Sequence, residues 1–166
     1  MSRPLTRLAI LALASMTSLA GHASSGSSLP WQNGHVCGND AVVLACQPAA
    51  NQPPIAVCAA TSAGTLDLYA TGHPNAQLLR SHLMFAGNTG GYAFTIVDGS
   101  ERTVLYAIEG TGVQDHGVIV TDAQGRTLRH GACTPGSFEE SQDDAVIDAS
   151  LRLPNDPALD RGQPAH

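Results

Sequence analysis

The runs GYAFTIV (residues 91–97), TVLYAIE (103–109) and GVIVTDAQGRTLRHGAC (117–133) decide the fold of this chain. In the first run Tyr92, Phe94 and Ile96 alternate with smaller side chains, and the second run has the same period of two. This period is typical of β-strands that turn one face to a core. Turn-forming sequences separate the runs: DGSER (98–102), GTGVQDHG (110–117) and DAQG (122–125). The stretch therefore predicts an antiparallel meander that ends at Cys133.

Short apolar runs before the meander predict further strands. They are AVVLAC (41–46), IAVCAA (55–60), TLDLYA (65–70) and AQLLRSHLMFAG (76–87). The last of these would suit a helix as well as a strand, and its β-type neighbours favour a strand. Seven or eight short strands with this spacing predict an all-β domain, either a single antiparallel β-sandwich or a small barrel.

The remainder of the chain has a different character. Ser137 followed by Glu140 fits a helix capping box, and the apolar residues after them recur at helical spacing, so we expect a short helix at about Phe138–Leu151. Seven of the fourteen acidic residues lie after Pro135. We therefore expect residues 136–166 to form an acidic tail that contains this helix.

The first 23 residues have the composition of an export signal. Two arginines precede an apolar run that is too short to span a membrane, and an uncleaved anchor helix is the alternative. Cleavage after Ala20 or after Ala23 fits the small-residue rule. The position that would carry the cysteine of a lipid-anchored protein is His22. We expect residues 1–23 to be a signal peptide and residues 24–36 to be a flexible leader.

Four cysteines follow this signal, and an even number in an oxidising compartment predicts two disulfides. They are Cys37, Cys46, Cys58 and Cys133. Three pairings are open, and a bridge from the first strands to Cys133 would contribute about 4 kcal/mol by closing a long loop. No pair has the two-residue gap of a zinc knuckle. We expect a disulfide-stapled β domain at residues 37–135 and a periplasmic or secreted location. Trp31 either packs in this domain or is an exposed contact.

Charge limits the choice of partner. The chain has eight arginines, no lysine and fourteen acidic residues, which give a net charge of −6. This charge disfavours nucleic acid and would steer a basic protein towards the acidic tail. We expect a protein partner in the periplasm or outside the cell, no nucleic acid and no membrane anchor.

No catalytic signature occurs in the sequence, which has neither a G-x-S-x-G elbow nor an H-E-x-x-H helix. The best polar cluster would join Asp98 and Glu101 to Asp115 and His116. Successive turns of a meander lie at opposite ends of its strands, ~17 Å or more apart, which argues against such a site. We therefore expect no enzyme, no catalytic residue, no cofactor and no metal.

Glycine-bearing loops are the expected contact surface, because glycine lets the backbone approach a partner and the strands beneath hold the loops in place. The loops are residues 88–91 and 110–117, and the candidate contact residues are Asn88, Gly90, Gly91, Gly112, Asp115 and His116. The sequence thus predicts an exported non-catalytic binding module, inhibitor-like in its use of these loops. The alternatives are an inhibitor of lysozyme or another periplasmic glycosidase, and a structural component of the envelope.

The runs VVLACQPAANQPPIAVCAATSAGTLDLYATG (42–72), GGYAFTIV (90–97) and GVIVTDAQGRTLRHGAC (117–133) resemble a set of small uncharacterised exported β-rich proteins of Gram-negative bacteria. Paired strand cysteines, an aromatic-glycine strand and a closing cysteine recur in that set. Ala70 stands where the set would have an arginine. The layout is also similar to periplasmic lysozyme inhibitors, which are disulfide-bonded β-barrels that insert a loop into a glycosidase cleft. The serine-glycine loop motif of those inhibitors is missing here.

Overall fold

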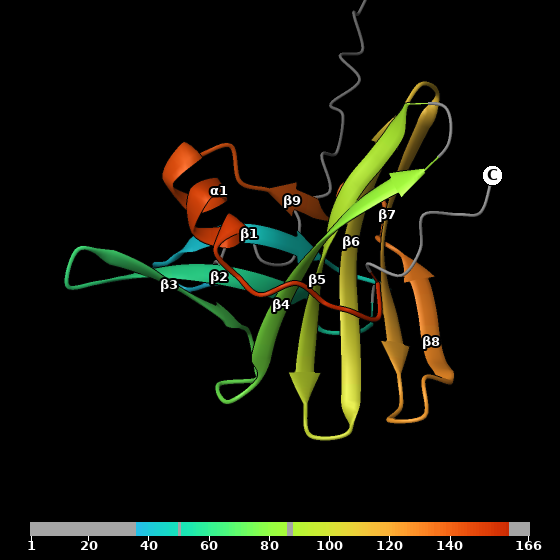
Figure 1. Cartoon of the computed structure of the whole chain (residues 1–166), viewed down its shortest axis with the longest axis horizontal. Helices are drawn as coiled ribbons and strands as arrows, with labels where there is room; N and C mark the ends of the chain where they lie inside the picture. The colour runs from blue at the N-terminus through green and yellow to red at the C-terminus, as the bar shows by residue number, and fades with distance from the viewer. Residues whose placement is uncertain (1–35, 50, 86–87, 160–166) are drawn as a thin grey trace, which may run out of the picture.

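The computed structural model describes residues 36–49, 51–85 and 88–159 (Figure 1). The predicted signal peptide, all but the last residue of the predicted leader, and Trp31 lie outside the described residues. Within those residues the chain forms two antiparallel sheets and one short helix. The sheets pack face to face, and Figure 1 shows the strands of one running across those of the other. This confirms the predicted all-β sandwich, and the described strands do not close into a barrel.

The four-stranded sheet consists of β1 (Ala41–Cys46), β2 (Ile55–Ser62), β3 (Thr65–Ala70) and β9 (Phe138–Glu140). Its order is β3-β2-β1-β9. The five-stranded sheet consists of β4 (Gln77–Phe85), β5 (Thr89–Asp98), β6 (Glu101–Gly110), β7 (Val113–Thr121) and β8 (Thr127–Ala132), in sequence order. The five-stranded sheet contains the predicted meander. Its first strand, β4, comes from residues 76–87, the run that would also have suited a helix. Two-residue turns join β5 to β6 and β6 to β7, so residues 113–117, expected to lie in a loop, continue a strand.

The main core lies between the two sheets. Phe94, Leu105 and Val120 of the five-stranded sheet meet Leu44 and Val57 of the four-stranded sheet, and all five side chains are almost completely buried. Phe94 and its alternate neighbours point into this core because successive strand residues face opposite sides. The residues between them point to the outer face of the five-stranded sheet, where Ala93, Val104 and Tyr106 form a second buried cluster. Both faces of the meander are therefore apolar.

Two disulfides select one of the three open pairings. Cys37 joins Cys58 across 21 residues, and Cys46 joins Cys133 across 87 residues. The second bond links the end of β1 to the residue that follows β8, so it ties the two sheets together. A loop of that length corresponds to about 4–5 kcal/mol in the chain-entropy model. Both bonds are compatible with an oxidising, exported location.

The helix is shorter than expected, and its cap is different. Phe138–Glu140 is strand β9, which pairs with β1, whereas the helix α1 (Asp144–Leu151) begins at an N-cap, Asp143. The side chain of Asp143 accepts a hydrogen bond from the backbone N–H of Ala145. Ser137 caps no helix, because its buried hydroxyl donates to the Gln47 carbonyl at 3.2 Å and accepts from the Gln47 N–H at 3.3 Å. The predicted helix end is correct, and its predicted first turn is a strand.

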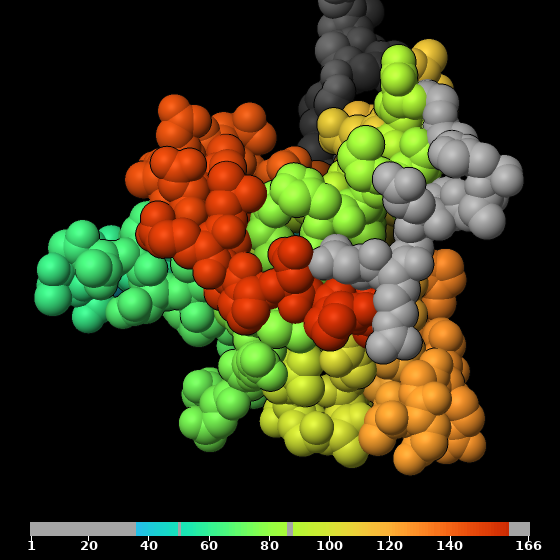
Figure 2. Space-filling model, viewed as in Figure 1, coloured from blue at the N-terminus to red at the C-terminus, as the bar shows by residue number. Residues whose placement is uncertain are grey.

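The segment from Pro154 to Leu159 belongs to the folded domain, although the sequence placed it in the tail. It crosses the outer face of the five-stranded sheet, as the red segment in Figure 2 shows. The backbone N–H of Arg80 in β4 donates to the Pro154 carbonyl at 2.9 Å. Asp156 has no exposed surface and accepts hydrogen bonds from Thr95 and Arg102. An acid that composition assigns to a solvated tail thus anchors the last described residues to the sheet.

Candidate functional site

The predicted contact residues gather at one end of the five-stranded sheet. The β4–β5 connection and the β6–β7 turn meet there, because Gly90 lies opposite Glu109 in the β5–β6 ladder. Gly110 lies so close to Thr89 that an added Cβ would be 2.5 Å from the threonine hydroxyl. The structure therefore brings the two predicted loop regions side by side. We call the surface formed by Met84, Phe85, Asn88 and Gly112 at this end, together with Tyr106, Asp115 and His130 on the adjoining outer face, the hairpin-end surface.

Most of the predicted contact residues are strand residues and not loop residues. Gly90 and Gly91 belong to β5, whereas Asn88 and Gly112 lie in the two connections with φ angles of 59° and 75°. A Cβ on Gly91 would lie 2.0 Å from the carbonyl oxygen of Ala107 in β6. Gly91 is thus needed for close strand packing, and its predicted contact with a partner stays a prediction.

Asp115 and His116 also lie in a strand, β7, and they face opposite sides of the sheet. The His116 ring stacks on Phe138 of β9 with ring centroids 3.7 Å apart, and only 17% of its side chain is exposed. Its Nε2 atom lies 3.7 Å from a carboxylate oxygen of Glu109. His116 therefore helps to join the sheets, and it lies in a strand where the sequence predicts a loop. Asp115 points to the outer face and remains exposed.

The outer face carries an apolar hollow of about 370 Å³. Strands β4 to β8 and the C-terminal segment line it, through residues that include Leu83, Phe85, Ile108, Ile119 and Leu159. At its upper rim Met84 is 61% exposed and Phe85 is 40% exposed. Large exposed apolar side chains around a hollow are typical of surfaces that bind a partner. The hollow is held by strands of one sheet, so its shape is part of the scaffold.

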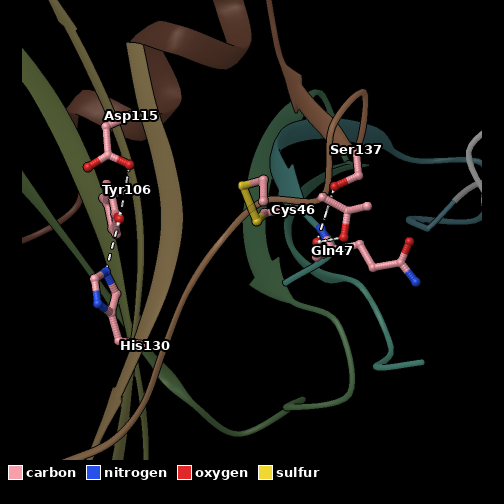
Figure 3. The surroundings of a disulfide bond; sticks show 8 residues. Cys46, Gln47, Tyr106, Asp115, His130 and Ser137 are labelled. Carbon is pink, nitrogen blue, oxygen red and sulfur yellow. Dashed lines mark hydrogen bonds between the residues drawn. A yellow bond between two sulfur atoms is a disulfide. The ribbon is translucent and has the colours of Figure 1, made fainter. Parts of the chain in front are cut away.

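A polar group of three side chains borders the hollow (Figure 3). The Tyr106 hydroxyl donates to an Asp115 carboxylate oxygen at 3.3 Å, and the Nε2 atom of His130 lies 3.3 Å from the same hydroxyl. Gly117 makes this arrangement possible, because it lies opposite Tyr106 and a Cβ there would be 2.6 Å from the tyrosine oxygen. The phenol ring therefore lies across β7 and reaches β8.

The protonation of Tyr106 follows from this setting. Burial of the phenol, and then the adjacent negative charge and hydrogen bond of Asp115, raise the pKa of Tyr106 above its usual value. The hydroxyl therefore keeps its proton at neutral pH. It serves as a hydrogen-bond donor to Asp115.

The sequence did not identify Tyr106, His130, Met84 or Phe85 as site residues. Their grouping depends on strand register, which places Tyr106 opposite Gly117 and Ile119 opposite His130. The one local signal is Gly117, two positions after the exposed Asp115 in the same strand. It indicates a site only when Tyr106 is known to lie opposite Gly117.

The acidic cluster considered from the sequence is divided in the structure. Asp98 and Glu101 flank the β5–β6 turn, whereas Asp115 lies opposite Ile108 near the other end of β6. Asp98 instead contacts His73, whose Nδ1 atom is 2.6 Å from its carboxylate. In residues 36–49, 51–85 and 88–159 no group of three or more His, Cys, Asp or Glu side chains is placed to hold a metal ion. The described helix is too short to cross a membrane.

Comparisons with models of protein families, with curated proteins and with solved structures gave no match for this chain.

Proposed function

We propose that the protein is an exported, non-catalytic binding module that engages a protein partner through the hairpin-end surface. The observation that carries this proposal is the apolar hollow with Met84 and Phe85 exposed at its rim. Protein interfaces combine an apolar centre with a polar rim, and the Tyr106, Asp115 and His130 group supplies such a rim. The raised pKa of Tyr106 keeps its hydroxyl protonated, so it can donate a hydrogen bond to a partner.

The rigidity of the surface also supports binding. The hollow is carried by five paired strands, and the C-terminal segment is held at Asp156 by Thr95 and Arg102. A surface that is ordered before binding loses little conformational entropy when a partner docks. The disulfide from Cys46 to Cys133 holds the two sheets together beneath it.

A basic glycosidase such as lysozyme is the second candidate partner. The chain carries a net charge of −6, and Asp115 places a carboxylate beside the hollow. An acidic surface increases the association rate with a basic partner and makes that rate depend on salt. Slowing of lysozyme by micromolar protein, with a weaker effect at high salt, is the expected result for this candidate.

The test compares variants for binding to a partner captured from envelope extract and then purified. Replacing Met84 and Phe85 together by serine removes exposed apolar surface without touching the core, and we expect affinity to fall at least tenfold. Leu151→Ser on α1 is the matched control, since Leu151 is also exposed but lies on the helix. Equal affinity of the double variant and the unchanged protein would show that this surface is not the contact.

A further inference from the structure

A second opening lies between the two sheets, beside residues 47–49 and 51–54 of the connection from β1 to β2. It consists of two hollows of about 550 and 450 Å³. Gln52, Ile55 and Arg129 line both hollows, so the two adjoin at these residues. Each volume falls in the range of ~300–1,000 Å³ that is usual for small-molecule sites. We call this opening the inter-sheet cleft, and it shares one lining residue, His130, with the hollow on the outer face.

The floor of the inter-sheet cleft is apolar where Ile55 of β2, Pro48 and the exposed Leu128 line it. Val118 and Val120 of β7 also border the smaller hollow, but they are almost completely buried. Two consecutive prolines in the loop, Pro53 and Pro54, line the larger hollow and have no N–H groups to satisfy. Water in contact with such a floor gains little, so an apolar chain that displaced it would bind favourably.

One cation lies where the two hollows adjoin. The guanidinium of Arg129 in β8 makes a single side-chain contact, to the Gln52 amide oxygen at 3.5 Å, which is at the limit of a hydrogen bond. Among the described residues, Arg129 has no carboxylate within ion-pair distance, whereas Arg102 and Arg126 are paired with Asp156 and Asp122. Arg129 is therefore an unpaired cation over an apolar floor, in an acidic protein.

The other polar groups of the cleft orient a ligand. Glu101 also lines the larger hollow, so its negative charge repels an anion beside it and favours placing the anion at Arg129. His73, also in that hollow, already contacts Asp98 through its Nδ1 atom. Thr103 and Thr71 add hydroxyl groups to the wall.

From this combination we infer that the inter-sheet cleft binds a single-chain amphipathic anion such as a medium-chain carboxylate. The carboxylate displaces the weak Gln52 contact and accepts hydrogen bonds from the Arg129 guanidinium, for which a planar carboxylate is the matching partner. The alkyl chain covers Ile55, Pro48 and the exposed Leu128. This ligand site depends on Arg129 and the proposed protein contact on Met84 and Phe85, so different substitutions test the two, although His130 lines a hollow of each.

The test is calorimetric titration of the purified disulfide-bonded protein with octanoate, decanoate and dodecanoate at submicellar concentration. Burial of each added methylene predicts an affinity increase of about fourfold. Decyltrimethylammonium has a similar chain and the opposite charge, so we expect it to bind at least tenfold more weakly than decanoate. Vesicles of phosphatidylglycerol distinguish a free anion from a lipid headgroup, and we expect no binding to them.

Arg129→Gln should weaken decanoate binding about tenfold and remove the preference for the anion. Arg152→Gln is the matched control, because Arg152 is another exposed arginine and lies at the end of α1. Because Arg129 is exposed, its substitution should leave the fold intact, which circular dichroism can check. Absence of decanoate binding at millimolar concentration, equal binding of the cationic amphiphile, binding only to vesicles, or unchanged binding by Arg129→Gln would each overturn the inference. None of these results would affect the proposed protein contact.

Discussion

Replacement of Asp156 by asparagine tests whether the C-terminal segment is an integral part of the fold. Asp156 has no exposed surface, and its carboxylate accepts hydrogen bonds from the Thr95 hydroxyl, the Arg102 guanidinium and the Ala158 backbone N–H. Asparagine is nearly isosteric and keeps one acceptor oxygen. The substitution therefore removes the charge and part of the hydrogen bonding, and it creates little cavity.

The expected loss follows from these contacts. Breaking a buried ion pair by removing one partner costs about 3–5 kcal/mol. Arg102 keeps 27% of its side chain exposed and can recover some hydration, and asparagine retains some of the hydrogen bonds, so the expected loss of unfolding free energy is about 2–3 kcal/mol. Asp148→Asn on the exposed side of α1 makes the same change of charge and should have no measurable effect.

The pH dependence gives a second measure of the same contact. Burial by itself raises the pKa of Asp156, but the hydrogen bonds from Thr95, Ala158 and Arg102 and the charge of Arg102 outweigh it, so the pKa lies below its usual value. A depressed pKa stabilises the folded state above the unfolded-state pKa of about 3.9, and the stabilisation is lost as pH falls through the folded-state pKa. The difference in unfolding free energy between the wild-type protein and Asp156→Asn should therefore have its full value at pH 7 and decrease below about pH 4.

Urea denaturation at pH 7 and at lower pH, followed by far-UV circular dichroism, measures both quantities. A loss below about 0.5 kcal/mol at pH 7, equal to that of an exposed acid, would refute the anchoring role of Asp156. A difference between the two proteins that grew as pH fell would contradict the assigned direction of the pKa shift.

Gly117→Ala should destabilise the fold by about 1–3 kcal/mol, because the added Cβ would lie 2.6 Å from the Tyr106 hydroxyl oxygen. Thermal unfolding measures this loss, and an unchanged melting temperature would contradict the packing argument. Replacement of Cys46 and Cys133 together by alanine should cost about 4–5 kcal/mol, and removal of the shorter 21-residue disulfide loop should cost about 3 kcal/mol. Denaturant titration of the two double variants checks the order, and an equal loss for both would exclude loop closure as the main contribution.

The sequence predicted the meander well because its signal is local. Tyr92, Phe94 and Ile96 alternate with their neighbours, and glycine-containing turns mark each hairpin, so strand number, direction and fold class follow without knowledge of distant contacts. The structure also shows why residues 76–87 form a strand. Both faces of β4 are covered at residues 78–81, one by the core and the other by the C-terminal segment, and an amphipathic helix would have left one side exposed.

The parts that the sequence did not predict depend on distant partners. Ser137 and Glu140 have the spacing of a capping box, but Ser137 bonds to Gln47, ninety positions away, and Glu140 accepts a hydrogen bond from Tyr92. Asp156 has an ordinary tail sequence around it, and only the register of β5 and β6 places Thr95 and Arg102 to receive it. Glycines at 91 and 117 were interpreted as loop or turn residues because close strand packing leaves no local signal.

Strand β9 and the C-terminal segment are synthesised after every other described part of the two sheets. Residues 138–159 supply the outer neighbour of β1 and the cover of the five-stranded sheet, yet they are the last described residues to leave the ribosome. Until they arrive, β1 has an unpaired edge, and an apolar face of the meander is open to other chains. A chain stopped at residue 137 would carry all four cysteines and eight of the nine strands, and would still expose both surfaces. The short terminal stretch therefore covers both the open edge of β1 and the apolar outer face, the two surfaces through which an unfinished chain would meet other chains.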